Sequence, residues 1–142
     1  MPETQMGFEG LAYYGPAGSQ ANQLITNSID ITESFGSEQG LTSVRGTGTA
    51  PVLDTKRTTG LNYSLKIGMR QKKSDTILAA FKAAHVTGAP VAIRTKDHAT
   101  GKGVDGDMIV TAMEKGKPLK GEQTLEFTFE PNDDNRAFQM EV

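Results

Sequence analysis

The sequence contains no cysteine and no tryptophan, and aromatic residues make up only 6% of its 142 positions. Without cysteine the chain has no disulfide framework, no thiolate nucleophile and no cysteine-ligated zinc site. Few aromatic rings also means few flat surfaces on which a sugar or a lipid can stack. A small β-barrel module that binds sugar or lipid is therefore disfavoured, but it stays open as an alternative.

The chain also lacks a dominant charge and a long apolar run. It has 15 basic and 17 acidic residues, for a formal net charge of −2, which gives no long-range field toward DNA or an anionic membrane. No window approaches the roughly 18 apolar residues of a membrane span, and the first residues have no basic or apolar stretch of the signal-peptide kind. We therefore expect synthesis in the cytoplasm, no signal peptide and no membrane partner.

No residue pattern points to catalysis. The only two histidines, His85 and His98, lie outside the motifs of metalloproteases and serine hydrolases. Asp105 and Asp107 could supply oxygen ligands, but the remaining ligands of a calcium loop are missing, which favours a solvated loop leading into a strand. The prediction is a protein that is not an enzyme, with no catalytic residue, no cofactor and no metal site.

Strands dominate the predicted secondary structure. Apolar residues alternate with polar or small ones without a fault from Leu61 to Met69, and similar alternation covers Gln123 to Glu130. A period of two is typical of a strand with one buried face. No repeat or linker divides the chain, so residues 1–142 are predicted to form one mainly β domain. We expect a β-sandwich or partly closed barrel with one short flanking α-helix.

That helix is predicted to begin after Ser74, whose side chain suits an N-cap. Ile77, Leu78 and Phe81 then follow at helical spacing and would form its buried face. Gly88 is expected to end the helix after about three turns.

A long loop is predicted over about residues 36–60. Glycines, threonines and serines break every hydrophobic period there, and a long irregular stretch within a compact domain is usually functional or disordered. Together with the strand that follows, this segment would form a hairpin arm that joins neighbouring subunits. The C-terminal tail, residues 132–142, combines an acidic turn with a short alternating segment that could pair with a sheet edge in this subunit or the next.

The order of elements resembles a known family. It runs from a strand at Ile25 to Glu33 through the long loop, the Leu61 to Met69 strand and the helix to strands at Met108 and Gln123. Locally, the segment GEQTLEFTFEP at 121–131 is similar to the last strand of such subunits. The layout resembles the tail tube (major tail) proteins of long-tailed phages, which are related in fold to the haemolysin-coregulated tube proteins of type VI secretion.

The resemblance implies a structural, self-assembling subunit of the virion tail, made in the host cytoplasm. Its partners would be copies of itself, in stacked six-membered rings, and other tail proteins, while DNA passes through without specific binding. A tail terminator, a baseplate component or a secretion-tube ring component remains the alternative within this class.

The resemblance also implies two groups of candidate residues. The loop between rings would carry Arg45, Asp54, Lys56 and Arg57. The lumen would be lined by Asp30, Glu126 and Thr128, because an acidic or neutral lining does not hold phosphates. Lys66 and Arg70, on the polar face of the Leu61 to Met69 strand, fit that lining poorly.

Overall fold

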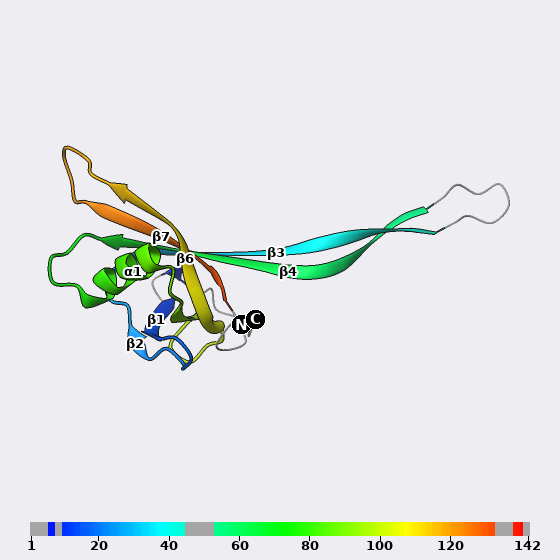
Figure 1. The fold of residues 1–142 in the computed structure, drawn as a ribbon, viewed down its shortest axis with the longest axis horizontal. Coiled ribbons are helices and arrows are strands. Elements are labelled where there is room, and N and C mark those ends of the chain that lie inside the picture. Colours follow the sequence, from blue (N-terminus) through cyan, green and yellow to red (C-terminus); the bar gives the residue numbers. More distant parts are fainter. Residues whose placement is uncertain (1–5, 8–9, 45–52, 133–137, 141–142) are drawn as a thin grey trace.

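The computed structural model describes residues 6–7, 10–44, 53–132 and 138–140. Its elements are β1 (Leu11–Pro16), β2 (Gln23–Leu24), β3 (Ser28–Val44), β4 (Leu53–Arg70), α1 (Thr76–Thr87), β5 (Val91–Lys96), β6 (Val104–Gly116), β7 (Thr124–Pro131) and β8 (Gln139–Met140). The strands form one antiparallel sheet in the order β2-β1-β5-β6-β7-β4-β3, with β8 added to β6. The predicted mainly β fold with one short helix is confirmed (Figure 1).

The sheet curves around the side chains of α1, which gives it the character of a partly closed barrel rather than two stacked layers. The ring of Phe81 lies 5.5 Å from that of Tyr14 on β1, and 5.4 and 5.0 Å from those of Phe127 and Phe129 on β7. Two strands, β5 and β6, separate β1 from β7 in the sheet. One helical side chain can reach both only because the sheet bends toward it.

Asp75 caps the N-terminus of α1. Its carboxylate Oδ1 accepts hydrogen bonds from the backbone N–H groups of Ile77 and Leu78, at 3.1 and 3.2 Å. The prediction of Ser74 as the cap is therefore wrong by one residue. Serine and aspartate are equally good caps, and the choice depends on which residue has the extended backbone, here Asp75 with φ −84° and ψ 108°.

The buried face of the helix agrees with the sequence prediction. Leu78 and Phe81 are buried, and the half-buried Ile77 packs against the same core. Gly88 ends the helix in the left-handed region at φ 73°, a conformation that glycine adopts without steric cost.

β3 and β4 form one long hairpin, and the prediction of a loop over residues 36–60 is wrong wherever the structure describes it. Residues 36–44 and 53–60 are paired strands from Gly36–Asn62 to Val44–Leu53, with one register shift between Glu38 and Gln39, while residues 45–52 lie outside the described residues. Most of this hairpin projects from the body of the molecule (Figure 1). The side chains of residues 36–39 and 56–58 are exposed, and exposed strands need no apolar alternation, so the pattern that marks half-buried strands is missing although the backbone pairs.

An extra residue in β6 changes which face its side chains occupy. Val110 pairs with Phe129 and Ala112 with Thr128, so Thr111 is the additional residue of a β-bulge. As a result Met113 packs toward the core while Glu114 lies on the opposite, exposed face.

The C-terminal tail returns to the sheet of the same chain. Gln139 and Met140 form β8 and pair with Asp105 and Val104 of β6, so the expected pairing with an edge is confirmed within the subunit. Residues 133–137 and 141–142 of the predicted tail lie outside the described residues.

Candidate functional site

The first candidate surface is the projecting part of the hairpin. We call residues 34–44 of β3 and 53–64 of β4 the arm, because β7 accompanies β4 only from Leu65 onward. No described strand pairs with either outer edge of the arm, so both edges present free backbone N–H and C=O groups. Such edges are natural places for another chain to bind.

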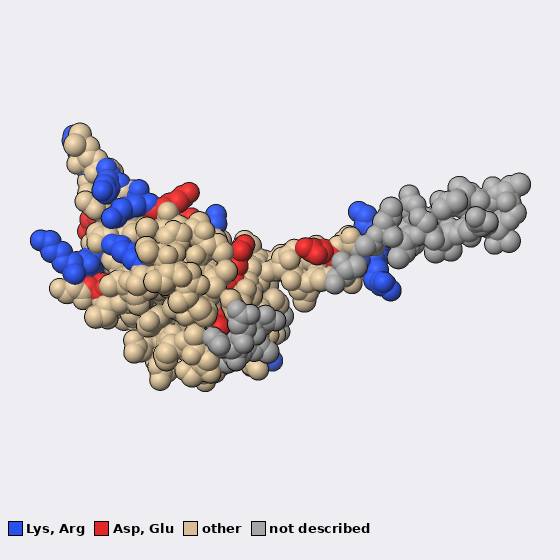
Figure 2. Space-filling model, viewed as in Figure 1, with Lys and Arg blue, Asp and Glu red and all other residues tan. Residues whose placement is uncertain are grey.

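Three of the four residues predicted for the loop between rings lie on the arm. Lys56 and Arg57 are exposed on β4, and the blue side chains on the arm are visible in Figure 2. Asp54 pairs with Ser43 in the backbone ladder. Arg45 lies outside the described residues.

The three residues predicted for the lumen lie on one face of the sheet. Thr128 is opposite Lys66 in the β4–β7 ladder, and Glu126 is opposite both Gly68 on β4 and Glu114 on β6. The backbone of Asp30 on β3 lies next to Gly68 on the other side. We call this exposed surface the polar face; it spans four neighbouring strands.

The polar face is locally acidic. A groove of about 440 Å³ on it is lined by three acidic residues, Asp30, Glu114 and Glu126, and by two lysines, Lys66 and Lys115. Arg70, which was predicted with Lys66 to fit the lumen poorly, forms an ion pair with the Glu122 carboxylate at 3.1 Å. Glu114 was not among the residues predicted for the lumen, because only the bulge at Thr111 brings its side chain to this face.

A second hollow lies at the root of the arm, where β7 leaves β4. We call it the notch; it has a volume of about 590 Å³ and is lined by Ser34, Phe35, Gly36, Leu61, Asn62, Tyr63, Ser64, Glu130 and Pro131. Phe35 is 50% exposed and Leu61 71% exposed, which is unusual for two large apolar side chains so close together. The rings of Phe35 and Tyr63 are 5.2 Å apart, so the apolar lining is continuous with the core.

Tyr63 anchors the arm to the body. Its ring packs on Phe138 of the C-terminal tail at 5.1 Å, and its hydroxyl is buried. Burial, together with the nearby negative charge of Glu33, raises the pKa of the Tyr63 hydroxyl well above its ordinary value. The group is therefore neutral at physiological pH and acts in packing rather than in proton transfer.

Asp105 and Asp107 are buried in a strand, and the prediction of a solvated loop is wrong. Both lie within β6 and are 9% and 0% exposed. Asp107 Oδ2 accepts a hydrogen bond from the Gly18 N–H at 2.9 Å, and Asp105 Oδ2 accepts one from Gln20 Nε2 at 3.3 Å. The two carboxylates thus hold the loop between β1 and β2 against the sheet.

The structure offers little support for other kinds of site. Among the residues it describes, no group of three or more histidine, cysteine, aspartate or glutamate side chains is placed to hold a metal ion. In the same part of the chain, no helix has the length and apolar character needed to span a bilayer. His85 lies in the last turn of α1, with Nδ1 at 3.3 Å from the Val110 carbonyl oxygen.

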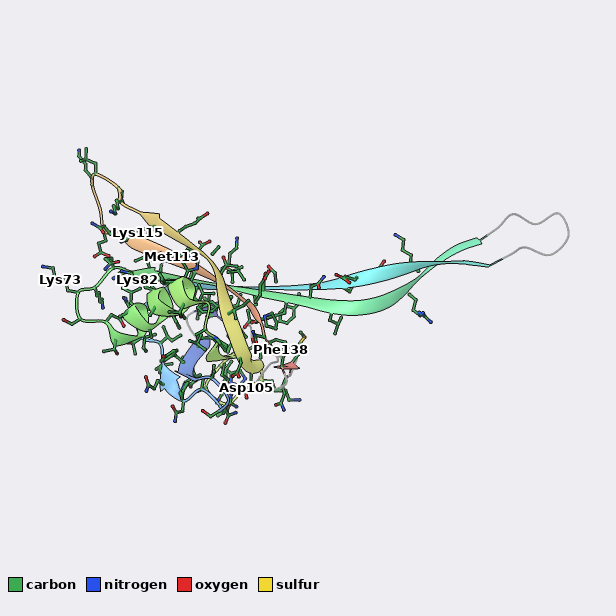
Figure 3. The ribbon with its side chains drawn as sticks, viewed as in Figure 1. Lys73, Lys82, Asp105, Met113, Lys115 and Phe138 are labelled. Atoms are coloured by element: carbon green, nitrogen blue, oxygen red, sulfur yellow. The ribbon has the colours of Figure 1, made fainter. Side chains whose placement is uncertain are left out.

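Lysines gather at the end of the body opposite the arm. We call this the basic end; it comprises Lys72, Lys73, Lys115, Lys117 and Lys120, all exposed. Figure 2 shows the blue cluster over the β6–β7 turn and the β4–α1 loop, and Figure 3 labels Lys73 and Lys115 within it. Leu119, at the β6–β7 turn, is 99% exposed among these lysines.

Comparison with known proteins gives matches only in three-dimensional structure. No protein-family model matches the sequence, and no curated protein matches it significantly. A solved structure of the tail of an empty gene transfer agent particle with C6 symmetry has a TM-score of 0.75 at 17% identity, covering 98% of this chain and all of that one. The SPP1 tail tube has a TM-score of 0.67 at 11% identity, covering 89% of this chain and 75% of that one.

A third similar structure comes from a different part of a tail-like assembly. The baseplate of the anti-feeding prophage contains a chain with a TM-score of 0.62 at 10% identity, and the match covers 99% of this chain and 97% of the other. All three matches cover 89% or more of this chain. The chain therefore has the fold of phage-type tail tube proteins.

Proposed function

We propose that this chain is a structural, non-enzymatic subunit of a phage-type tail tube, in which rings of six copies stack to form a conduit for DNA. The observation that carries the proposal is the full-length match to a gene transfer agent tail with C6 symmetry. The sheet ends in β2 and β3, and strands of neighbouring copies can add to the outer edges of these strands through backbone hydrogen bonds to close a ring. The resulting ring would be part of a virion tail.

The polar face is the proposed wall of the lumen. Asp30, Glu114 and Glu126 give it a local excess of negative charge. Phosphates bind where lysines and arginines can displace counterions, so a surface whose three carboxylates outnumber its two lysines does not attract the DNA backbone. DNA would therefore slide past this wall without being held.

The arm is the proposed contact between rings. It projects from the body (Figure 1) and carries the exposed Lys56 and Arg57. A two-stranded ribbon is marginally stable on its own in water, so packing of the arm on a copy in the next ring would stabilise it.

A ring of a baseplate or of a tail terminator is the second candidate. The baseplate match with a TM-score of 0.62 favours it directly. Such a component would form rings of the same kind, but its rings would not stack on themselves into a long tube.

Electron microscopy of the purified, concentrated protein separates these possibilities. A tube subunit should give tubes whose end views show six-fold rings, and light scattering should show mass increasing with concentration. Single rings that never stack would favour the baseplate or terminator role. A strictly monomeric protein at high concentration would contradict both.

A further inference from the structure

Two exposed apolar features lie at opposite ends of the same sheet. One is Leu119 at the β6–β7 turn, and the other is the notch with Phe35 and Leu61. β7 connects them, because Thr124 follows the turn and Pro131 lines the notch. Seven steps of about 3.3 Å separate these ends by roughly 23 Å, so Leu119 cannot fill the notch of its own chain.

The surroundings of the two features have opposite charges. Leu119 lies between the exposed Lys117 and Lys120. The notch is lined by the exposed Glu130, and Glu38, which is paired with Gly60 one step along the arm from Leu61, carries its carboxylate on the other face of the ribbon. A single exposed leucine is ordinary on a protein surface, but an apolar tip between two cations and an apolar hollow beside two carboxylates are complementary.

We propose that Leu119 of one copy inserts into the notch of a second copy, with Lys117 and Lys120 facing Glu38 and Glu130 of that copy. The inference rests on the proposed function and specifies which surfaces of successive rings meet. The two surfaces are different and lie at the two ends of β7. Their contact is therefore head-to-tail and repeats along an axis instead of closing after two copies.

Disulfide trapping tests this contact cleanly, because the chain has no cysteine of its own. The variant with both Leu119→Cys and Leu61→Cys should give a ladder of covalent oligomers when oxidised under assembly conditions. A mixture of the two single variants should give covalent dimers without a ladder. Val86→Cys with Leu61→Cys is the matched control, since Val86 is 81% exposed on α1 but is assigned no partner.

A charge exchange provides the second readout. Lys117→Glu with Lys120→Glu should prevent stacking while leaving single rings, and adding Glu38→Lys with Glu130→Lys should restore it. Leu119→Ser should raise the protein concentration needed for tubes by about tenfold, because it removes a buried apolar side chain from each contact. All of these positions are exposed, so thermal unfolding of the subunit should be unchanged.

The outcomes distinguish failure of this contact from failure of the proposed function. Tubes that form from the double-cysteine variant without a ladder, or a ladder equally strong in the Val86 control, would overturn the contact and leave the tube subunit intact. Failure of the unsubstituted protein to form rings or tubes would overturn both. Stacking that is not restored by the four-fold charge exchange would also count against the assignment of Glu38 and Glu130.

Discussion

The body and the arm are built from the same two strands but are stabilised differently. Along β4, Met69, Ile67, Leu65 and Tyr63 are at most 5% exposed, whereas Leu61 is 71% exposed. The change occurs where β7 ends its pairing with β4 and the core beneath the sheet stops. Strand pairing alone therefore does not bury side chains: the body is stabilised by hydrophobic packing, and the arm by its backbone ladder.

Removing the arm should have the largest effect on assembly and little effect on the stability of the body. Replacing residues 38–60 by Asn-Gly joins Ser37 to Leu61, which are partners in the ladder, through a favourable two-residue turn. We expect tubes to disappear while the free energy of unfolding changes by no more than about 1 kcal/mol, because little buried surface is lost. Electron microscopy and urea unfolding measure the two effects. Tubes that persist in the truncated protein would refute a stacking role for the arm.

A cavity in the body should have the next largest effect. Phe81→Ala removes a ring that contacts β1 and β7, and we expect a loss of about 3–5 kcal/mol in the free energy of unfolding. Lys56→Ala in the arm is the matched control and should cost less than about 0.5 kcal/mol. Equal losses for the two variants in urea unfolding would contradict the distinction between body and arm.

The helix cap should have a smaller effect that is specific to one position. Asp75→Ala removes the acceptor for two backbone N–H groups and should cost about 1 kcal/mol. Ser74→Ala, one residue earlier, should be nearly neutral because Ser74 is outside the cap. The pair can be compared by thermal unfolding, and an equal loss at both positions would show that the cap is assigned incorrectly.

Alkaline pH should produce the smallest effect at the junction of body and arm. The pKa of Tyr63 is raised in the folded state, mainly by burial, so folding favours the protonated hydroxyl. Its contribution to stability is complete below the unfolded pKa of about 10 and declines as the pH rises above that value. Tyr63→Phe should therefore show a weaker loss of stability between about pH 10 and 11 than the unsubstituted protein. Identical pH profiles for the two proteins would contradict this.

The parts of the fold that could be predicted are those with a buried face. The alternation at Leu61 to Met69 identified the core of β4, and the spacing of Leu78 and Phe81 identified α1, because burial imposes a period on the sequence. The arm was predicted as a loop because its side chains at residues 36–39 and 56–58 are exposed, on both faces of the ribbon. No apolar period is required there, and glycines such as Gly36 and Gly40 do not prevent backbone pairing.

The candidate site depends on contacts between distant segments, which a single sequence does not specify. Asp30, Glu126 and Thr128 were predicted individually, but Glu114 joins them only through the bulge at Thr111. Likewise, the burial of Asp107 depends on a loop 89 positions earlier in the chain. The notch was not predicted, since it exists only because β7 is shorter than β4.

The bulge at Thr111 gives β6 one residue more than the strand it faces, so the polar face should tolerate loss of that one codon. Without Thr111, Val110 and Ala112 would be consecutive residues opposite Phe129 and Thr128, and Glu114 would stay opposite Glu126. A one-residue deletion in β7, which has no extra residue to lose against β4, would instead exchange the two faces of the strand beyond the deletion. The same kind of in-frame deletion would thus be silent at one position of the sheet and would rearrange its charges at another.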